Sequence, residues 1–278
     1  MEHIKEKAAT LIEALPYIQQ YHGKIVVIKY GGAAMVNKKL KESVLRDIVL
    51  LKHVGMNPVI VHGGGPNVSA AMKKAGIEPR FVDGLRVTDE RTIKIVKEEF
   101  AKINKDIVNM LKNQKVYAEG TTGTDNKLIE VKQKHKKLGF VGEISNINPV
   151  VIKTLIKVGY VPVISPIGVD SKGLAYNINA DTAAASIAIA LKAEKLTILT
   201  DVDGVFENKK LVPTLTMKQV KEKVKKGVIQ GGMIPKVKAC KYAVERGCKK
   251  AHLINGQITH ALLLEIFTDK GVGTEIVK

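Results

Sequence analysis

Short apolar runs alternate with longer segments of helical periodicity along most of the chain. Five runs are rich in β-branched and other apolar residues and are predicted to be strands. They are residues 24–30, 58–61, 161–165, 195–200 and 250–254. Helical spacing follows the first two runs, near residues 39–53 and 67–75. Apolar strands that alternate with helices are typical of a parallel sheet covered on both faces, so the pattern predicts an α/β fold.

An additional helix is predicted ahead of the first strand, over residues 1–22. Its apolar residues recur at helical spacing. They are Ile4, Ala8, Leu11, Ile12 and Leu15. Pro16 should kink or interrupt this helix, because a proline ring removes one backbone hydrogen bond and crowds the preceding turn. The spacing leaves two alternatives open: the apolar stripe packs on the body of the same chain, or on another subunit.

The middle of the chain, about residues 81–140, follows the alternation less closely. Turn pairs such as Asp83-Gly84 flank strand-like pieces there. We therefore expect β-hairpins in this region, forming a flap over a site. A soft boundary is expected within residues 167–177, where glycines cluster, with one ligand held on each side of it.

Composition narrows the classes of protein to consider. The chain has 278 residues, of which 45% are hydrophobic, which is enough for one large or two modest cores. Two cysteines, Cys240 and Cys248, are too few for a disulfide framework and lack the spacing of a zinc site. No run resembles a signal peptide or approaches the ~20 apolar residues of a membrane span. We expect a cytoplasmic protein that makes no membrane contact.

The net charge of +18 raises the question of nucleic-acid binding. The lysines are spread along the whole chain, however, and the sequence contains no tryptophan and only 4% aromatic residues for stacking bases. We interpret the charge as a lysine-rich solvated surface and expect no nucleic-acid partner. A positive field would also help to attract anionic substrates.

Glycine-rich clusters follow the first two predicted strands, where open α/β sheets bind ligands. Lys29 closes the first strand and precedes Gly31 and Gly32, whose backbone could approach an anion closely; the alternative is a solvated lysine before a plain turn. Residues 63–65 are three consecutive glycines between a strand and a helix, which indicates an anion-binding nest. Their spacing is neither that of a P-loop nor that of a dinucleotide-binding fingerprint.

Two further clusters lie in the second half of the chain. Asn177, Asn179 and Asp181 precede a helix that begins near residue 182. Asp181 either caps that helix or meets a ligand, and the two asparagines would present their amides to one side of an extended segment. Lys236 lies in the first turn of another helix, beside free backbone N–H groups; an exposed helix-start lysine is the alternative.

Two more candidates carry charge suited to anions or metal ions. Arg86, in a predicted hairpin, is suited to bidentate binding of a carboxylate. Asp201 and Asp203 follow a predicted strand, where they could bind Mg²⁺ or simply shape a turn.

Six motifs taken in order resemble the amino acid kinase superfamily, and within it the acetylglutamate kinase family of the arginine-sensitive type. They are K-Y-G-G, V-H-G-G-G-P, G-L-R-V-T, N-I-N-A-D, T-D-V-D-G-V and G-G-M-I-P-K. The resemblance covers residues 24–278. It implies an open αβα sandwich around a mainly parallel central sheet, preceded here by the extra N-terminal helix.

The resemblance also implies an activity. This is the ATP-dependent phosphorylation of the γ-carboxylate of N-acetyl-L-glutamate in arginine biosynthesis, with Mg²⁺ accompanying ATP. Residues 23–176 would form the lobe that binds N-acetyl-L-glutamate, and residues 177–278 the lobe that binds ATP. The alternative is a superfamily kinase that acts on carbamate, aspartate or glutamate.

Individual roles follow from the same resemblance. Lys29 and Lys236 would neutralise charge on the migrating phosphoryl group, and Asp181 would orient both. The substrate would be bound by Gly64, Gly65, Arg86, Asn177 and Asn179. The nucleotide would be bound by Gly31, Gly32, Asp201, Val202, Asp203, Gly204, Val205, Phe206, Val228, Ile229 and Gln230. His62 is interpreted as structural, because the attacking carboxylate is already ionised at neutral pH and needs no general base.

The ends of the chain resemble the regulatory parts of arginine-sensitive members. The helix over residues 1–22 is similar to an extension that links dimers into a ring, which implies a homohexamer arranged as a trimer of dimers. The C-terminal sequence is similar to the arginine site, which implies feedback inhibition by L-arginine bound near His252, Glu265 and Gly271. For Glu265 the alternative is a solvated helix residue.

Overall fold

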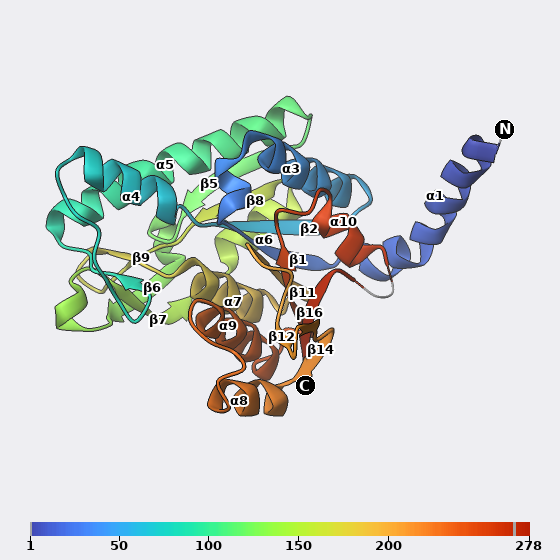
Figure 1. The fold of residues 1–278 in the computed structure, drawn as a ribbon. Helices are drawn as coiled ribbons and strands as arrows, with labels where there is room; N and C mark the ends of the chain where they lie inside the picture. Colours follow the sequence, from blue (N-terminus) through green and yellow to red (C-terminus); the bar gives the residue numbers. More distant parts are fainter. Residues whose placement is uncertain (1, 269–270) are drawn as a thin grey trace.

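The computed structural model describes residues 2–268 and 271–278, and its central layer is an eight-stranded sheet (Figure 1). In spatial order the strands are β14 (Thr214–Thr216), β16 (Gly273–Val277), β15 (Lys250–Asn255), β11 (Lys195–Thr200), β1 (Ile25–Tyr30), β2 (Asn57–His62), β8 (Val161–Ser165) and β5 (Ala118–Thr122). Every neighbouring pair is parallel except β15 with β16. The predicted α/β class is confirmed, and the five predicted strands coincide with β1, β2, β8, β11 and β15.

Helices cover both faces of the sheet, which confirms the αβα sandwich (Figure 1). One core lies against α3 (Lys38–His53), α4 (Gly65–Lys74), α5 (Glu90–Asn113) and α10 (Ala261–Ile266). The other lies against α6 (Val150–Lys157), α7 (Ala180–Leu191), α8 (Met217–Lys225) and α9 (Met233–Glu245). Because side chains alternate along a strand, Val26 and Ile28 of β1 enter the first core and Val27 enters the second.

The predicted N-terminal helix is present as α1 (Glu2–Tyr21), which projects from the body (Figure 1). It continues through Pro16, so of the two expected effects, a kink or an interruption, the interruption is wrong. Leu11 and Ile12 are 73% and 68% exposed, so this part of the apolar stripe does not pack on the chain's own body. Met1 and the side chain of Ile4 lie outside the part that the structure describes.

The region 81–140 differs from the expectation of hairpins alone, because it contains the 24-residue helix α5. The residues that form the buried face of α5 recur at helical spacing. It includes Ile93, Val96, Phe100, Ile103 and Ile107. The side chain of Asp89 caps the helix by accepting a hydrogen bond from the backbone N–H of Thr92 at 2.8 Å.

The hairpin expected at Asp83-Gly84 is present as β3 (Phe81–Val82) and β4 (Leu85–Arg86). A second, four-stranded sheet has the order β10 (Ala175–Asn177), β9 (Ile167–Val169), β6 (Ile129–Gln133) and β7 (Gly142–Ile147). An isolated bridge pairs Val141 with Asn177, which joins the segment before β7 to the end of β10. This small sheet thereby forms one wall of the site described below.

Short elements complete the chain. They are α2 (Ala33–Val36), η1 (Asp125–Lys127), η2 (Lys136–Leu138), β12 (Phe206–Glu207) and β13 (Lys210–Leu211). Residues 167–177, where a boundary was expected, contain β9 and β10. The strand β1 lies before this segment and pairs with β11 after it, so both halves of the chain share the central sheet. None of the helices in the described part is long and apolar enough to cross a membrane.

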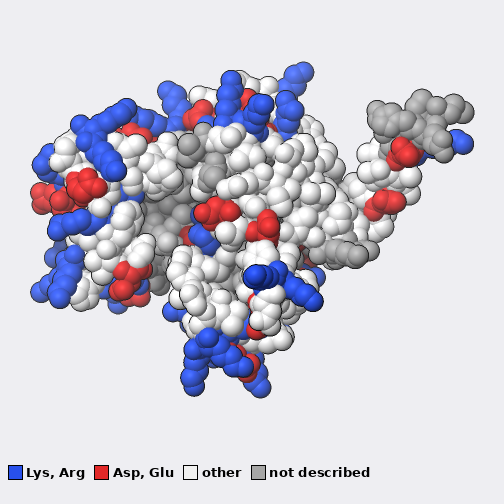
Figure 2. Space-filling view, in the orientation of Figure 1, with Lys and Arg blue, Asp and Glu red and all other residues white. Residues whose placement is uncertain are grey.

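Figure 2 shows how the charge is distributed on one face of the molecule. Lys and Arg side chains lie around its margins, with Asp and Glu between them, instead of forming one continuous basic patch. On this face the excess of lysine therefore takes the form of a solvated, mixed surface.

Candidate active site

A cavity of about 280 Å³ lies at the carboxyl ends of β1 and β2. Ten of the site residues that were predicted from the sequence line this cavity. They are Lys29, Gly31, Gly32, Gly64, Gly65, Arg86, Asn177, Asn179, Asp181 and Lys236. Parallel strands bring their carboxyl ends to one edge of a sheet, which is why motifs that are far apart in the sequence meet here.

Asp181 holds the two lysines of this cavity together. It lies in the first turn of α7 and is only 4% exposed. The ammonium of Lys29 lies 3.0 Å from its Oδ1 as an ion pair, and Lys236 donates to its Oδ2 at 3.3 Å. Burial alone would raise the pKa of Asp181, but the charges of Lys29 and Lys236 outweigh it and hold that pKa below its usual value. Asp181 is therefore an anion at neutral pH.

The cap of α7 is Asn179, whose Oδ1 accepts a hydrogen bond from the N–H of Thr182 at 3.0 Å. The alternative role for Asp181 as helix cap is therefore wrong. Capping uses the oxygen of Asn179 and leaves its amide nitrogen able to donate to a ligand. The amide nitrogen of Asn177 donates to the hydroxyl of Thr88 at 3.3 Å, which fixes this side chain at the cavity wall.

The triple glycine, residues 63–65, turns the chain from β2 into α4. A Cβ added at Gly64 would lie 2.7 Å from Ile103 and 2.8 Å from Phe100, so a larger residue does not fit. The N–H groups of Gly64 and Gly65 donate to no carbonyl or side chain within residues 2–268 and 271–278. Because α4 begins at Gly65, its free N–H groups and positive dipole end lie at the cavity, as anion binding requires.

Arg86 supplies a third positive charge. Its guanidinium donates to the carbonyl of Gly65 at 2.9 Å and to the hydroxyl of Ser69 at 2.8 Å, and it lies over the ring of Phe81. No Asp or Glu in the described part of the chain forms an ion pair with it. A rigid guanidinium without a carboxylate partner is suited to binding a carboxylate of a ligand.

Of the residues expected to bind the nucleotide, only Gly31 and Gly32 line this cavity. The segment 201–206 follows β11, next to β1 in the sheet. There Asp203 accepts a hydrogen bond from Asn255 at 2.7 Å, and Asp201 accepts one from Thr200 at 3.1 Å. Residues 228–230 connect α8 with α9, and the side chain of Ile229 is part of the core.

Metal ligands do not gather at these aspartates. Throughout the described residues, no group of three or more His, Cys, Asp and Glu side chains is arranged to hold a metal ion.

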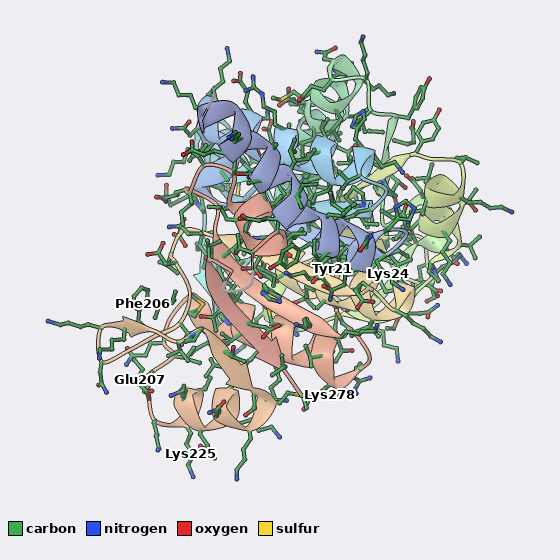
Figure 3. All side chains as sticks on the ribbon, turned by 90° about the vertical axis from the view of Figure 1, so that its right-hand side faces the viewer. Tyr21, Lys24, Phe206, Glu207, Lys225 and Lys278 are labelled. Carbon is green, nitrogen blue, oxygen red and sulfur yellow. The ribbon has the colours of Figure 1, made fainter. Side chains whose placement is uncertain are left out.

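A second cavity of about 270 Å³ brings together His252, Glu265 and Gly271. Tyr17 and Tyr21 of α1 line it too, and Figure 3 shows Tyr21 where α1 joins the body. This cavity thereby connects the N-terminal helix with the C-terminal segment.

Glu265 is the buried anion of this second cavity. It is 5% exposed, so the alternative of a solvated helix residue is wrong. Lys195 donates to its Oε1 at 3.0 Å, the N–H of Val272 donates to its Oε2 at 3.1 Å, and His252 pairs with Oε1. Burial would raise the pKa of Glu265, but the hydrogen bond and charge of His252 and the charge of Lys195 bring it to about 2.

Sequence reasoning missed several residues of both cavities. Lys195 was taken only as the start of a strand, although a lysine that is 2% exposed at that position needs an acidic partner. Phe100 was missed because α5 was not predicted. The apolar periodicity of residues 93–107 is the signal that could have found it.

Comparison with known proteins gives consistent results. The family model described as "Amino acid kinase family" matches residues 24–255. The acetylglutamate kinase of Caldanaerobacter subterraneus subsp. tengcongensis is 53% identical over 279 residues, which cover 98% of this chain and 93% of the relative. That of Desulforamulus reducens is 48% identical over 280 residues, covering 98% of each. That of Methanocaldococcus jannaschii is 51% identical over 290 residues, which cover 98% of this chain and 97% of the relative.

Solved structures share the fold. The N-acetylglutamate synthase of Neisseria gonorrhoeae, complexed with coenzyme A and N-acetyl-glutamate, superimposes with a TM-score of 0.88 at 25% identity. The match covers 98% of this chain but only 63% of the synthase chain. The carbamate kinase of Giardia lamblia bound to AMP-PNP has a TM-score of 0.67 at 21% identity. The match covers 92% of this chain and 99% of the carbamate kinase chain. The latter similarity concerns the fold alone.

Proposed function

Because this chain belongs to the amino acid kinase family, we propose that it transfers the γ-phosphoryl group of ATP to the γ-carboxylate of N-acetyl-L-glutamate. The observation that carries the proposal is the pairing of Lys29 and Lys236 with one buried carboxylate, in the cavity that the triple glycine lines. The similarity to acetylglutamate kinases over nearly the whole chain supports this choice of substrate.

The arrangement fits the demands of phosphoryl transfer. The attacking carboxylate has an unperturbed pKa of about 4.3, so it is an anion at neutral pH and needs no base. The obstacle is repulsion between this anion and the phosphates of ATP. Lys29, Lys236 and the free N–H groups of residues 63–65 offer positive ends that can offset the charge of the transferring group. Asp181 holds the two ammonium groups at a fixed separation, although they repel each other.

The remaining polar groups would orient N-acetyl-L-glutamate. Arg86 would hold its α-carboxylate in a bidentate pair, with the amides of Asn177 and Asn179 beside it. Gly64 and Gly65 would bind the reacting carboxylate and phosphoryl oxygens through their N–H groups. In this assignment residues 23–176 form the lobe for N-acetyl-L-glutamate.

ATP, as its Mg²⁺ complex, would bind to the lobe formed by residues 177–278. We assign the nucleotide to residues 201–206 and 228–230, and its terminal phosphates to Gly31 and Gly32. This places the γ-phosphoryl group between the glycine loop and Lys236. We further assign the enzyme to the cytoplasm and to arginine biosynthesis.

The second cavity would bind L-arginine as a feedback inhibitor. Glu265, a buried carboxylate at neutral pH, would attract the guanidinium or the amino group, with His252 and Gly271 beside it. The exposed apolar residues of α1 support a homohexamer in which paired α1 helices link three dimers, because such a stripe is stabilised when a second helix covers it.

A phosphorylation assay with four acceptors tests the proposed substrate. ATP is supplied with N-acetyl-L-glutamate, glutamate, aspartate or carbamate, and any acyl phosphate is trapped with hydroxylamine. We expect product with N-acetyl-L-glutamate and little with the other three. Preferential phosphorylation of another acceptor would assign the protein to a different member of the family.

A further inference from the structure

His62, the last residue of β2, lies fully buried directly before the triple glycine. Burial lowers the pKa of its imidazole to about 4, so the ring is neutral at neutral pH. It does not line the active-site cavity, and the proposed chemistry requires no base. Its position and hydrogen bonds nevertheless connect it to the loop that does line the cavity.

Both ring nitrogens of His62 have partners. Nδ1 lies 2.7 Å from the carbonyl oxygen of Gly63, which can only accept, so Nδ1 carries the proton and donates it. Nε2 then accepts from the hydroxyl of Ser165, at the end of β8, at 2.9 Å. The tautomer is therefore set by the carbonyl of Gly63, because the hydroxyl of Ser165 can either donate or accept.

Asn104 of α5 completes this buried network. Its amide nitrogen donates to the hydroxyl oxygen of Ser165 at 3.1 Å and to the carbonyl of Val163 at 2.9 Å. Ser165 thus accepts from Asn104 and donates to His62, so every group has a consistent role. The chain of bonds runs from α5 and β8 to the peptide between Gly63 and Gly64.

Packing restrains the same loop from the other side. The ring of Phe100 meets the His62 ring edge-on, with centroids 5.5 Å apart. Phe100 and Ile103 also occupy the space beside Gly64. The carbonyl of Gly63 is held by His62, and the turn at Gly64 has no room to shift toward α5.

We propose that His62 is a positioning residue for phosphoryl transfer: its Nδ1–H bond to the carbonyl of Gly63 orients the glycine loop so that the N–H groups of Gly64 and Gly65 meet the charge that develops on the transferring group. This role rests on the proposed kinase function and adds a residue that touches neither substrate. Groups that act in the transition state must be placed to within a fraction of an ångström, so loosening this one bond reduces turnover more than substrate binding.

Two substitutions separate the two nitrogens of the ring. In His62→Asn the amide nitrogen can take the place of Nδ1 and keep the bond to Gly63, but it cannot reach Ser165. In His62→Gln the amide lies at the position of Nε2, so the bond to Ser165 is kept and the bond to Gly63 is lost. We expect His62→Gln to lower kcat on the order of 10²-fold with little change in KM, and His62→Asn to stay within roughly tenfold of the wild type.

Matched controls exclude a general loss of structure. His53→Asn and His53→Gln make the same changes at an exposed histidine of α3 and should leave kcat and KM unchanged. Ser165→Ala keeps the imidazole and its bond to Gly63, so kcat should stay within about threefold of the wild type even if the melting temperature falls.

The outcomes are decisive whether or not every variant folds. Equal loss of kcat in folded His62→Asn and His62→Gln would overturn the proposal. If His62→Gln does not fold, a 10²-fold loss in His62→Asn or in Ser165→Ala would overturn it as well. The assay uses whichever acceptor the wild-type protein phosphorylates, so failure of N-acetyl-L-glutamate as substrate would refute the proposed function without deciding the role of His62.

Discussion

The ammonium of Lys29, near the end of β1, lies 3.0 Å from Oδ1 of Asp181 in the first turn of α7. Lys236 pairs with the other oxygen of the same carboxylate at 3.3 Å. One buried anion thus fixes two cations from distant parts of the chain at the wall of one cavity. In the proposed phosphoryl transfer, this geometry would supply charge stabilisation that exists before the substrates arrive.

Removal of either lysine should reduce turnover strongly. Because each ammonium would stabilise charge that develops on the phosphoryl group, Lys29→Ala and Lys236→Ala should each lower kcat by roughly 10²- to 10³-fold. Steady-state kinetics and circular dichroism measure the loss and the retained fold. Lys24→Ala, at an exposed position before β1, is the control and should behave as the wild type. Normal turnover in either active-site variant would remove that lysine from the mechanism.

Neutralising Asp181 should affect both stability and activity. Asp181→Asn leaves two ammonium groups without a counter-charge at a buried site, which should lower the free energy of unfolding at pH 7 by about 3 kcal/mol. Because the pKa of Asp181 is depressed, its stabilisation is present above its unfolded pKa and is lost as the pH falls through the folded pKa. Urea unfolding and kcat test this, and a variant as stable and active as the wild type would contradict the assigned role.

The buried imidazole of His62 should make the free energy of unfolding depend on pH. Its pKa falls from 6.5 to about 4 on folding, so below pH 6.5 the unfolded chain binds a proton that the folded chain does not. The contribution of His62 is therefore present above pH 6.5 and lost as the pH falls toward 4, by up to about 3 kcal/mol. Urea unfolding of the wild type and of His62→Asn between these pH values should show a difference that shrinks with falling pH. Parallel curves would contradict the buried, neutral imidazole.

Binding of L-arginine should depend on the charge of Glu265. Glu265→Gln keeps the shape of the side chain but removes the anion that would receive the ligand's cationic group, so affinity should fall by at least tenfold. Isothermal titration calorimetry measures this directly. Glu98→Gln, on the exposed face of α5, is the matched control. Equal affinities in both variants would show that arginine does not bind at this carboxylate.

The N-terminal helix should control assembly. Deletion of residues 1–22 removes the exposed stripe that contains Leu11 and Ile12, and it also removes the tyrosines that line the second cavity. We expect smaller oligomers by light scattering and a lost arginine response. Leu11→Ser combined with Ile12→Ser should reduce oligomer size while leaving Tyr21 in place. An unchanged oligomer and an unchanged arginine response would contradict the regulatory proposal.

Local patterns predicted the central strands well, because runs such as β8 and β11 are buried throughout and consist mainly of apolar residues. They did not predict α5, where the turn pair Asp83-Gly84 was given more weight than the apolar spacing of residues 93–107. The meeting of Lys29 with Asp181 was implied only by the family resemblance. No local pattern contains it, since it depends on β1 pairing with β11 and on where α7 begins.

The most direct test of the central claim is a crystal structure with ADP, N-acetyl-L-glutamate and aluminium fluoride, which mimics the transferring phosphoryl group. The account predicts that the ammonium groups of Lys29 and Lys236 and the N–H groups of Gly64 and Gly65 all lie within hydrogen-bonding distance of the fluorides or of the oxygens on either side. A mimic bound away from the glycine loop, or contacted by neither lysine, would contradict it.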